Sequence, residues 1–301
     1  MANWIREYRV LAGIPGQPGF LIGNTVNGRA LHVSFDLEKS DTESSNTGRL
    51  TISNLSDEHK AMLNEKGCVV EIKAGYLKGM LNTIFVGDVS STSESLNNAD
   101  RDIEIELIDG FSNFDKPGSI SMNGVITCGT IVEEIKAAMG IESVIITPAA
   151  QERLDSAMYD NGYAFVGKMK AALQKTLYKA GLTYTLQDGT LQIYVDGEAV
   201  GTQAFVLNGH TGLISIPKKI TISESSDKTA VETEEGQSTT EKGIPGYEVE
   251  YFLNGAVGVN DLVILESDLV SGTFRVKKQH YSGDNYSGDW KCTSQLVEVT
   301  A

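Results

Sequence analysis

The sequence predicts a mainly β protein with an α+β insert. Alternating apolar and polar side chains, the pattern of half-buried strands, recur in the first third and the last third of the 301 residues. The clearest case is Tyr247–Leu253, in which every second residue is apolar. Two helical patterns and a hairpin signal stand between these β-rich parts. The 31 glycines and 6 prolines, with many Thr, Val and Ile residues, agree with β-rich structure.

Composition narrows the classes of function. The chain is long enough for two domains or three small ones, and its 41% hydrophobic content is sufficient for packed cores. The formal net charge of −15 argues against a surface that grips nucleic acid, because phosphate binding needs clustered Lys and Arg. The same charge suits a protein past which DNA slides without sticking.

Cysteine usage and hydropathy indicate a reducing compartment. Cys68, Cys128 and Cys292 are odd in number and lie far apart, without CxxC or Cys/His spacing. We therefore expect isolated reduced thiols and no metal site. The first residues lack the apolar stretch of a signal peptide, and no run of about eighteen apolar residues occurs. We expect a soluble protein made in the cytoplasm, with no membrane-spanning segment and no sequence-encoded export.

Residues 1–111 are predicted to form one β-rich domain with a short helix. Ser56 is a suitable N-cap, acidic residues follow it in the first turn, and Gly67 stands where a C-terminal glycine cap belongs. The polar run Lys39–Asn46 is expected to be a loop. The expected strands are Tyr8–Ala12, Leu31–Glu38, Arg49–Ser53, Val69–Ala74, Ile84–Val89 and Asp102–Leu107.

Residues 112–204 are predicted to be an α+β middle domain. Thr130 and Glu133 have the spacing of a capping box at the start of one helix, and a second helix is expected at Tyr163–Ala180. Asp188-Gly189 is a strong signal for a two-residue hairpin turn. The hairpin strands are expected at Leu182–Leu186 and Leu191–Val195.

Residues 205–301 return to the β pattern and are predicted to form a C-terminal antiparallel barrel or sandwich. Segment 224–242 holds six acidic residues and two lysines among Ser, Thr and Gly, so it cannot bury a face and should be a mobile loop. The expected strands are Gly212–Ile216, Ile220–Ile222, Tyr247–Leu253, Leu262–Leu265, Thr273–Lys277 and Lys291–Val299.

Several short sequences along the chain occur in an order that is similar to a known family. Asn54-Leu55-Ser56 opens the short helix, Ala74-Gly75-Tyr76 ends a strand, and Phe85-Val86-Gly87 lies in the next strand. Near the C-terminus, GYEVEYFLN and GDNYSGDW precede the closing strand. This ordered set resembles the baseplate hub proteins of contractile-tailed phages and related phage-tail-like particles. The resemblance covers nearly the whole chain, most loosely at 112–200.

The resemblance implies two tube-like antiparallel β-barrel domains that flank a small helix-plus-hairpin middle region. It implies a structural role without enzymatic activity: a homotrimeric baseplate hub that joins the sixfold tail tube to a threefold central spike. DNA would pass through the surrounded channel without specific binding. The implied partners are the tail tube or tube-initiator protein and a trimeric spike, with the tape-measure protein and the baseplate wedge as further candidates. The protein would belong to the virion tail baseplate, assembled in the host bacterial cytoplasm.

Other classes of function stay open. A distal tail or tube-initiator ring protein of a long-tailed phage would form a hexamer rather than a trimer. A cell-wall-interacting module would need exposed aromatic side chains on one face, for which Tyr281, Tyr286 and Trp290 are the candidates. A cell-wall hydrolase is the remaining alternative, but no GxSxG, HExxH, Walker or GxGxxG motif selects an enzyme.

No residue pattern defines a catalytic, cofactor-binding or metal site. The four histidines, His32, His59, His210 and His280, are isolated in sequence. We interpret Asp284, Asn285 and Asp289 as turn residues, because their spacing differs from that of a calcium loop. Two groups of basic residues are interpreted as solvated surface. The first group, which could instead contact an acidic neighbouring protein, comprises Lys168, Lys170, Lys175 and Lys179. The second group comprises Arg275, Lys277 and Lys278.

Overall fold

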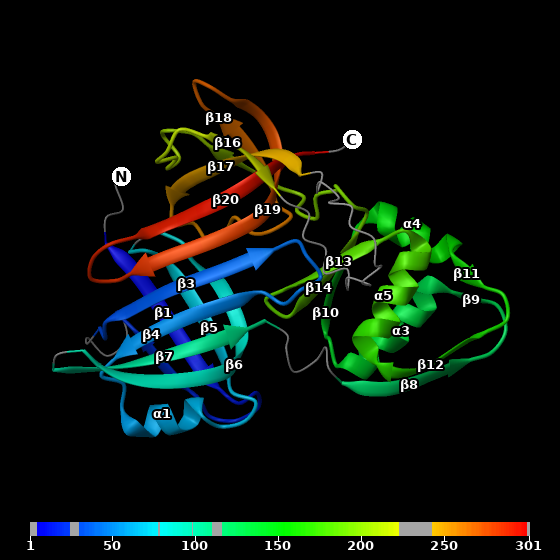
Figure 1. Cartoon of the computed structure of the whole chain (residues 1–301), viewed down its shortest axis with the longest axis horizontal. Coiled ribbons are helices and arrows are strands. Elements are labelled where there is room, and N and C mark those ends of the chain that lie inside the picture. The colour runs from blue at the N-terminus through cyan, green and yellow to red at the C-terminus, as the bar shows by residue number, and fades with distance from the viewer. Residues whose placement is uncertain are drawn as a thin grey trace, which may run out of the picture.

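The computed structural model describes residues 5–24, 30–77, 79–97, 99–109, 116–222 and 243–299. Strands dominate both ends of the chain, and most of the helical structure lies in the middle (Figure 1). The prediction of a mainly β fold with a small helical insert is confirmed. Within the described ranges, no helix is long and apolar enough to span a membrane.

One large sheet contains strands from both ends of the chain. The first part supplies β1 Arg6–Gly13, β2 Phe20–Gly23, β3 Val33–Ser40, β4 Thr47–Ser53, β5 Val69–Tyr76, β6 Leu81–Asn97 and β7 Asp100–Ile108. The last part supplies β15 Ala204–Leu207, β16 Lys218–Ile222, β17 Ile244–Phe252, β18 Leu262–Glu266, β19 Ser271–Asp284 and β20 Trp290–Glu298. The strand order is β16-β17-β20-β19-β3-β4-β7-β6-β5-β1-β2, and β18 joins β15 to β19.

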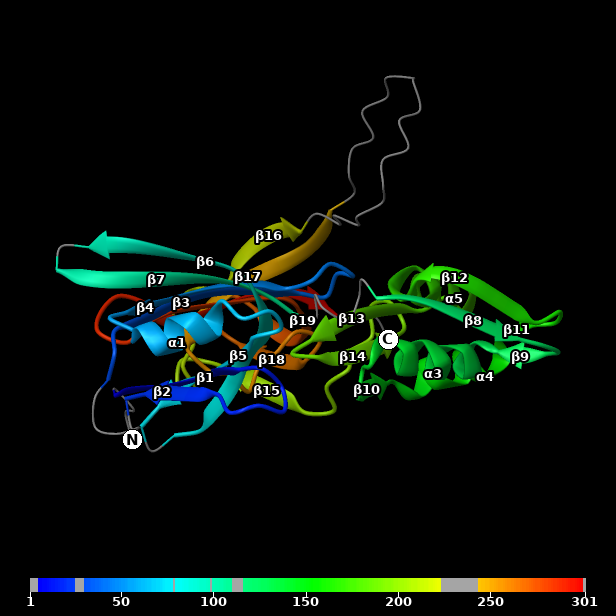
Figure 2. The same ribbon diagram turned by 90° about the horizontal axis from the view of Figure 1, so that it is seen from below.

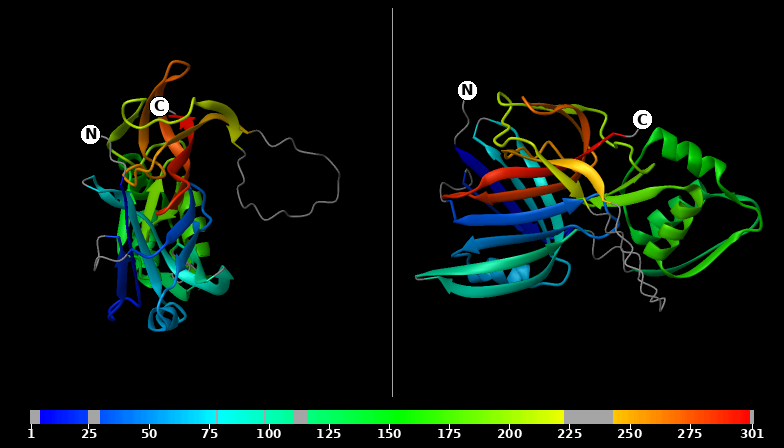
Figure 3. Two further views of the ribbon diagram at one scale, coloured as in Figure 1. Left: turned by 90° about the vertical axis from the view of Figure 1, so that its left-hand side faces the viewer. Right: turned by 45° about the horizontal axis from the view of Figure 1, so that its top comes forward.

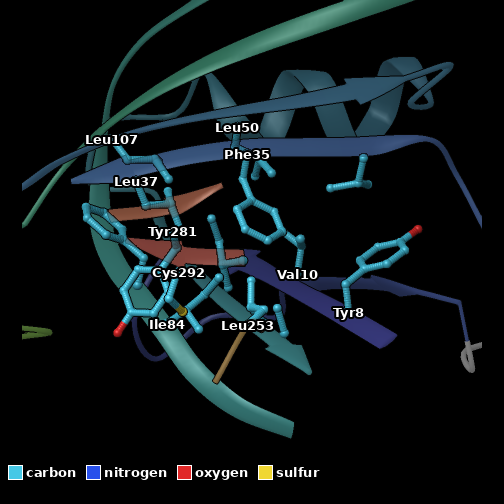
Figure 4. Packing of buried hydrophobic residues seen from close by; sticks show 14 of the residues in the cluster. Tyr8, Val10, Phe35, Leu37, Leu50, Ile84, Leu107, Leu253, Tyr281 and Cys292 are labelled. Atoms are coloured by element: carbon cyan, nitrogen blue, oxygen red, sulfur yellow. The ribbon is translucent and has the colours of Figure 1, made fainter. Parts of the chain in front are cut away.

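Strands β3 and β19 form the seam between the two parts. They pair antiparallel, from Lys278 opposite Ser40 to Asp284 opposite Ser34. A single buried hydrophobic cluster lies behind the seam and takes side chains from both parts (Figure 4). The alternation seen in the sequence therefore directs both β-rich parts to one shared core. Members of this cluster include Tyr8, Leu37, Leu50, Ile84, Leu253 and Tyr281.

Helix α1 (Asp57–Leu63) lies in the first β-rich part, as predicted. The side chain of Ser56 accepts a hydrogen bond from the backbone N–H of His59, which makes it the N-cap. Leu63 is buried in the shared core, so one face of this short helix is fixed by packing. The three cysteines are buried and form no disulfide, in agreement with the sequence.

The middle of the chain folds into a lobe with its own hydrophobic core, beside the large sheet (Figure 2). Helices α3, α4 and α5 pack together there, with the β8–β12 pair along one side of the lobe. The elements are β8 Pro117–Met122, β9 Ile126–Thr127, α3 Cys128–Met139, β10 Ser143–Ile146, α4 Pro148–Ser156, β11 Met158–Tyr159, β12 Tyr163–Lys168, α5 Met169–Ala180, β13 Thr183–Gln187 and β14 Thr190–Tyr194.

The predicted helix Tyr163–Ala180 is wrong in its first part. Tyr163–Lys168 is a strand paired with β8, and the helix begins only at Met169. Gly167 has a φ of 149°, which no α-helix contains. Val166, expected on the apolar face of the helix, is instead 84% exposed.

Two further local predictions need correction. The first middle helix begins one turn earlier than expected, because Thr127 rather than Thr130 is the N-cap and accepts from the Thr130 N–H. The expected strand Gly212–Ile216 is only a bridge between Leu213 and Tyr251. The helix α4 was not predicted, since its short apolar set gives little helical periodicity.

The division into 1–111, 112–204 and 205–301 stays a prediction. The first boundary and the expected acidic loop 224–242 lie outside the described residues.

Candidate functional site

A wide polar face covers one side of the large sheet, on the strands that surround the seam. In Figure 2, β7, β4 and β3 form this side of the molecule, and no described helix lies over it. Cross-strand register places the side chains in rows, such as Glu106, Arg49 and Asp36 on β7, β4 and β3. We call this set the polar face. It comprises Ser91, Ser93, Glu104, Glu106, Arg49, Thr51, Ser34, Asp36, Glu38, Lys278, His280, Ser282, Lys291, Thr293 and Gln295.

Carboxylates dominate the part of the polar face before the seam, on strands β7, β4 and β3. Arg49 is the basic residue there, and its Nε lies 3.0 Å from Glu106 Oε1 and 3.6 Å from Glu104 Oε2. These neighbouring carboxylates raise the pKa of Arg49, chiefly through the hydrogen bond to Glu106. On the next two strands, His280 Nε2 lies 3.0 Å from Asp36 Oδ2. Because exposed ion pairs contribute little stability, the consequence of this arrangement is its surface potential.

A shallow hollow of about 270 Å³ lies in the polar face at the seam. Asp36, Arg49, Asp284 and Asp289 are among its lining residues. Gly283 lies directly over the ring of Phe35, and a Cβ at this position would overlap that ring. The packing of Phe35 in the core therefore requires a glycine opposite it, near the end of the β3–β19 pairing.

The turn after β19 is held by its own polar side chains, as the sequence predicted. Asp284 accepts hydrogen bonds from the backbone N–H groups of Tyr286 and Ser287, at 2.8 and 2.9 Å. Burial raises the pKa of Asp284, but these N–H groups and His32 outweigh burial, so the pKa lies below its usual value. Asn285 accepts from the Val33 N–H at 2.8 Å and so ties the turn to β3.

Arg6, near the N-terminus, binds the turn that follows β19. Its guanidinium donates to the carbonyl oxygens of Asp284, Ser287 and Gly288, the last at 2.7 Å. It also lies 5.7 Å from the centre of the Trp290 ring. The planar fork of arginine suits three carbonyls in one turn.

A buried polar junction attaches the middle lobe to the large sheet. The predicted hairpin turn Asp188-Gly189 has φ values of 53° and 76°, both in the left-handed region, as a type I′ turn requires. Lys39 Nζ lies 2.5 Å from Asp188 Oδ2, and the Lys39 side chain is only 4% exposed. Asp188 Oδ1 also accepts from the Val86 N–H at 2.9 Å. The turn therefore contacts strands β3 and β6 of the sheet.

Asp109 forms hydrogen bonds with the Asp188-Gly189 turn. Its carboxylate accepts from the backbone N–H groups of Asp188 and Gly189, at 2.7 and 3.1 Å, and from the Asn46 side chain. Burial and the neighbouring Asp188 charge raise the pKa of Asp109 to about 7, although Lys39 and the hydrogen bonds oppose them. The junction thus contains an acid that titrates near neutral pH.

A second buried group, around Asp41, joins the lobe to β19. Arg275 Nη1 lies 2.7 Å from Asp41 Oδ2 and Lys277 Nζ lies 3.1 Å from Asp41 Oδ1. The Tyr194 hydroxyl donates to the Asp41 carbonyl. The interpretation of Arg275 and Lys277 as solvated residues is therefore wrong, whereas Lys278 does lie at the surface, 3.8 Å from Glu38.

Solved structures with the same fold are tail proteins and a secretion-system component. The 43 kDa tail protein of prophage MuSo2 from Shewanella oneidensis is 12% identical, with a TM-score of 0.58 over 97% of this chain and 98% of that chain. A tail protein from Neisseria meningitidis is 11% identical, with a TM-score of 0.59 over 97% of this chain and 96% of that one. The chain has the fold of phage tail proteins.

A type VI secretion system component of Escherichia coli also shares this tail-protein fold. It is 10% identical, with a TM-score of 0.54 over 91% of this chain and 76% of that chain, and is described as similar to the T4 tail proteins gp27 and gp5. No protein-family model matches the sequence, and no curated protein matches it. At sequence identities this low, the similarity establishes a shared fold and nothing further.

Within the tail-protein fold, the aromatic residues suggested for glycan stacking do not form a surface cluster. Trp290 and Tyr281 are buried in the shared core, 5% and 1% exposed. Only Tyr286 of the three is exposed, and its ring stacks on His32 with centroids 4.8 Å apart. The prediction of a possible sugar-stacking face is therefore wrong.

The four histidines are dispersed across the fold. His32 and His280 pair with Asp284 and Asp36 at the seam. His59 stacks on Phe20, with ring centroids 4.2 Å apart. His210 lies in a turn in which its N–H donates to Asn208. Among the described residues, no histidine belongs to a group of three or more His, Cys, Asp or Glu side chains that could hold a metal ion.

Proposed function

We propose that this chain is the structural baseplate hub of a phage tail. In this proposal three copies form a symmetry adapter that joins the sixfold tail tube to a threefold central spike. The observation that carries the proposal is the uncovered polar face, which lies on a sheet containing both β-rich parts of the chain. A sheet that is polar on one side and buried on the other can form the wall of a water-filled channel.

The carboxylates on the part of the polar face before the seam support a channel wall on which DNA is not held, whereas Lys278 and Lys291 lie beyond the seam. The strands before the seam carry four carboxylates on this face and one basic residue, Arg49. The carboxylates belong to Glu104, Glu106, Asp36 and Glu38. Release of counterions from DNA needs basic side chains, so the carboxylate-rich part of the face gives phosphates little attachment. In this role the protein is a non-enzymatic virion component, assembled in the bacterial cytoplasm. Its neighbours would be the tail tube or tube-initiator protein and the spike, with the tape-measure protein and baseplate wedge as further candidates.

Native mass spectrometry over a concentration series, followed by electron cryomicroscopy of any assembly, tests the proposal. We expect a trimer with the polar face toward the central channel. A hexameric ring would favour a distal tail or tube-initiator protein instead. A chain that stays monomeric at every concentration, or a ring with the polar face outward, would contradict the hub.

A further inference from the structure

The outer side of α5 carries basic and aromatic side chains that stay outside the lobe core. No acidic residue occurs between Asp160 and Asp188, whereas four lysines do, in a chain with a net charge of −15. Leu173 and Leu177 turn into the lobe core. Lys175, Tyr178 and Lys179 remain exposed on the other side. We call these three residues the α5 patch.

The α5 patch has the composition of a protein-binding anchor. Tyr178 is 86% exposed, and it lies between two lysines on the same part of the helix. Lys175 forms no ion pair with any residue that the structure describes. Lys179 lies 4.5 Å from the centre of the Tyr159 ring rather than beside a carboxylate. Tyrosines are enriched at the centres of protein interfaces, and charged side chains belong to the polar rim around them.

A groove of about 350 Å³ between α3 and α4 has the complementary character. Val132 and Leu154 form its floor, and the carboxylates of Glu133 and Asp155 lie at its rim. Both carboxylates are on exposed residues. Figure 2 shows α5 with β12 on one side of the lobe and α3 and α4 on the other. One copy can therefore offer its α5 patch and its α3–α4 groove to two different neighbours.

We propose that the α5 patch of one copy docks into the α3–α4 groove of a second copy. Tyr178 would lie over the apolar floor, and Lys175 and Lys179 would meet Glu133 and Asp155. The two surfaces differ, so the contact is head to tail, and repetition of such a contact closes into a ring when the rotation allows. This contact rests on the proposed hub function, and it specifies which surfaces of the lobe connect the copies of the trimer.

Charge reversal with rescue tests this contact on the whole chain. One variant carries Lys175→Glu and Lys179→Glu, a second carries Glu133→Lys and Asp155→Lys, and a third carries all four changes. Sedimentation at low salt is expected to show at least about tenfold weaker self-association for the first two variants, and recovery for the third. Lys66→Glu, which reverses an exposed lysine near α1, is the control and should leave association unchanged.

The outcomes separate this inference from the proposed function. A trimer that resists both double reversals, or a fourfold variant that does not recover, overturns the docking and leaves the hub proposal standing. A wild-type chain that never associates overturns both. Tyr178→Ala gives a charge-independent check, since it should weaken association without altering the circular dichroism spectrum. A different result would also overturn the docking: the wild-type chain binds double-stranded DNA, and the Lys175→Glu, Lys179→Glu variant loses DNA binding but remains a trimer. The α5 patch would then be a phosphate-binding surface.

Discussion

Lys39 and Asp188 form an ion pair, with Lys39 Nζ 2.5 Å from Asp188 Oδ2, that connects the large sheet to the hairpin of the middle lobe; the lysine is buried and the aspartate is partly exposed. The lysine ammonium also lies 5.6 Å from the centre of the Phe85 ring and 5.9 Å from that of Tyr281. A charge in such surroundings depends on its partner, because water does not reach it.

Removal of the Asp188 carboxylate should therefore destabilise the junction strongly. Asp188→Asn keeps a residue that tolerates the left-handed turn conformation but removes the carboxylate that is paired with the Lys39 ammonium. We expect a loss of about 3 kcal/mol in the free energy of unfolding, measured by urea denaturation. Asp160→Asn, an exposed change in the same lobe, should have an effect near zero. Equal stability of the two variants would show that the ion pair does not fix the lobe.

Asp109 should make stability depend on pH near neutrality. Its pKa is about 7 in the folded chain and 3.8 without burial, so the folded state binds the proton more tightly. The stabilising contribution is complete below about pH 4 and is lost as the pH rises through 7, with a slope of up to about 1.4 kcal/mol per pH unit.

Asp109→Asn removes this titration. The unfolding free energy of the variant, measured by urea denaturation from pH 4 to pH 8, should fall less steeply than that of the wild type. The variant should also be less stable at every pH, because one amide oxygen cannot accept from both turn N–H groups. Parallel pH profiles for the two proteins would contradict the raised pKa.

Arg6 should stabilise the turn after β19 through its guanidinium geometry rather than its charge alone. Arg6→Ala is expected to cost about 2 kcal/mol and to expose residues 284–288 to proteolysis. Arg6→Lys should recover only part of the loss, because an ammonium cannot reach three carbonyls in one plane. Full recovery by lysine would point to a charge effect, and Arg9→Ala on the same strand provides the matched control.

Gly283 should tolerate no side chain. A Cβ at this position overlaps the Phe35 ring, so Gly283→Ala must displace the ring or separate the seam strands. We expect a cost of about 2 kcal/mol, measured as a lower midpoint of thermal unfolding. Gly209→Ala is the control, because nothing lies within 4 Å of a Cβ built there. A neutral Gly283→Ala would mean that Phe35 has room to move.

The carboxylates on the part of the polar face before the seam should keep DNA from binding there. Glu104→Lys with Glu106→Lys is expected to give salt-sensitive retention on double-stranded DNA that the wild type lacks, because each lysine releases counterions on contact. Glu142→Lys on the lobe, an exposed reversal away from the polar face, controls for net charge. DNA binding by the wild type at the same salt concentration would contradict an acidic channel wall.

Local patterns predicted most of the strands and the hairpin turn, but not the partners of the turn. Asp188-Gly189 is a turn signal because only certain residues accept its backbone angles. Its ion pair with Lys39, 149 residues away, has no local sequence signature. The same holds for Arg275, which is 234 residues from Asp41 and reads as a surface residue from its neighbours alone.

The misplaced start of α5 has a different cause. Phe165, Val166 and Met169 have helical spacing, so periodicity could not distinguish a strand that runs directly into a helix. Gly167 was the available signal, since a glycine within a helical pattern weakens that assignment. Pairing with β8, set by residues more than forty positions earlier, decided the outcome.

The β3–β19 seam also governs the order in which the chain can fold. His280 and Asp36 meet across it although they are 244 residues apart, so β3 has no partner on this side until β19 has been synthesised. Contacts of this separation slow folding, and unpaired strand edges favour aggregation in the meantime. During translation β3 must therefore wait with one edge unpaired, and a chain interrupted before β19 would expose that edge to other nascent chains.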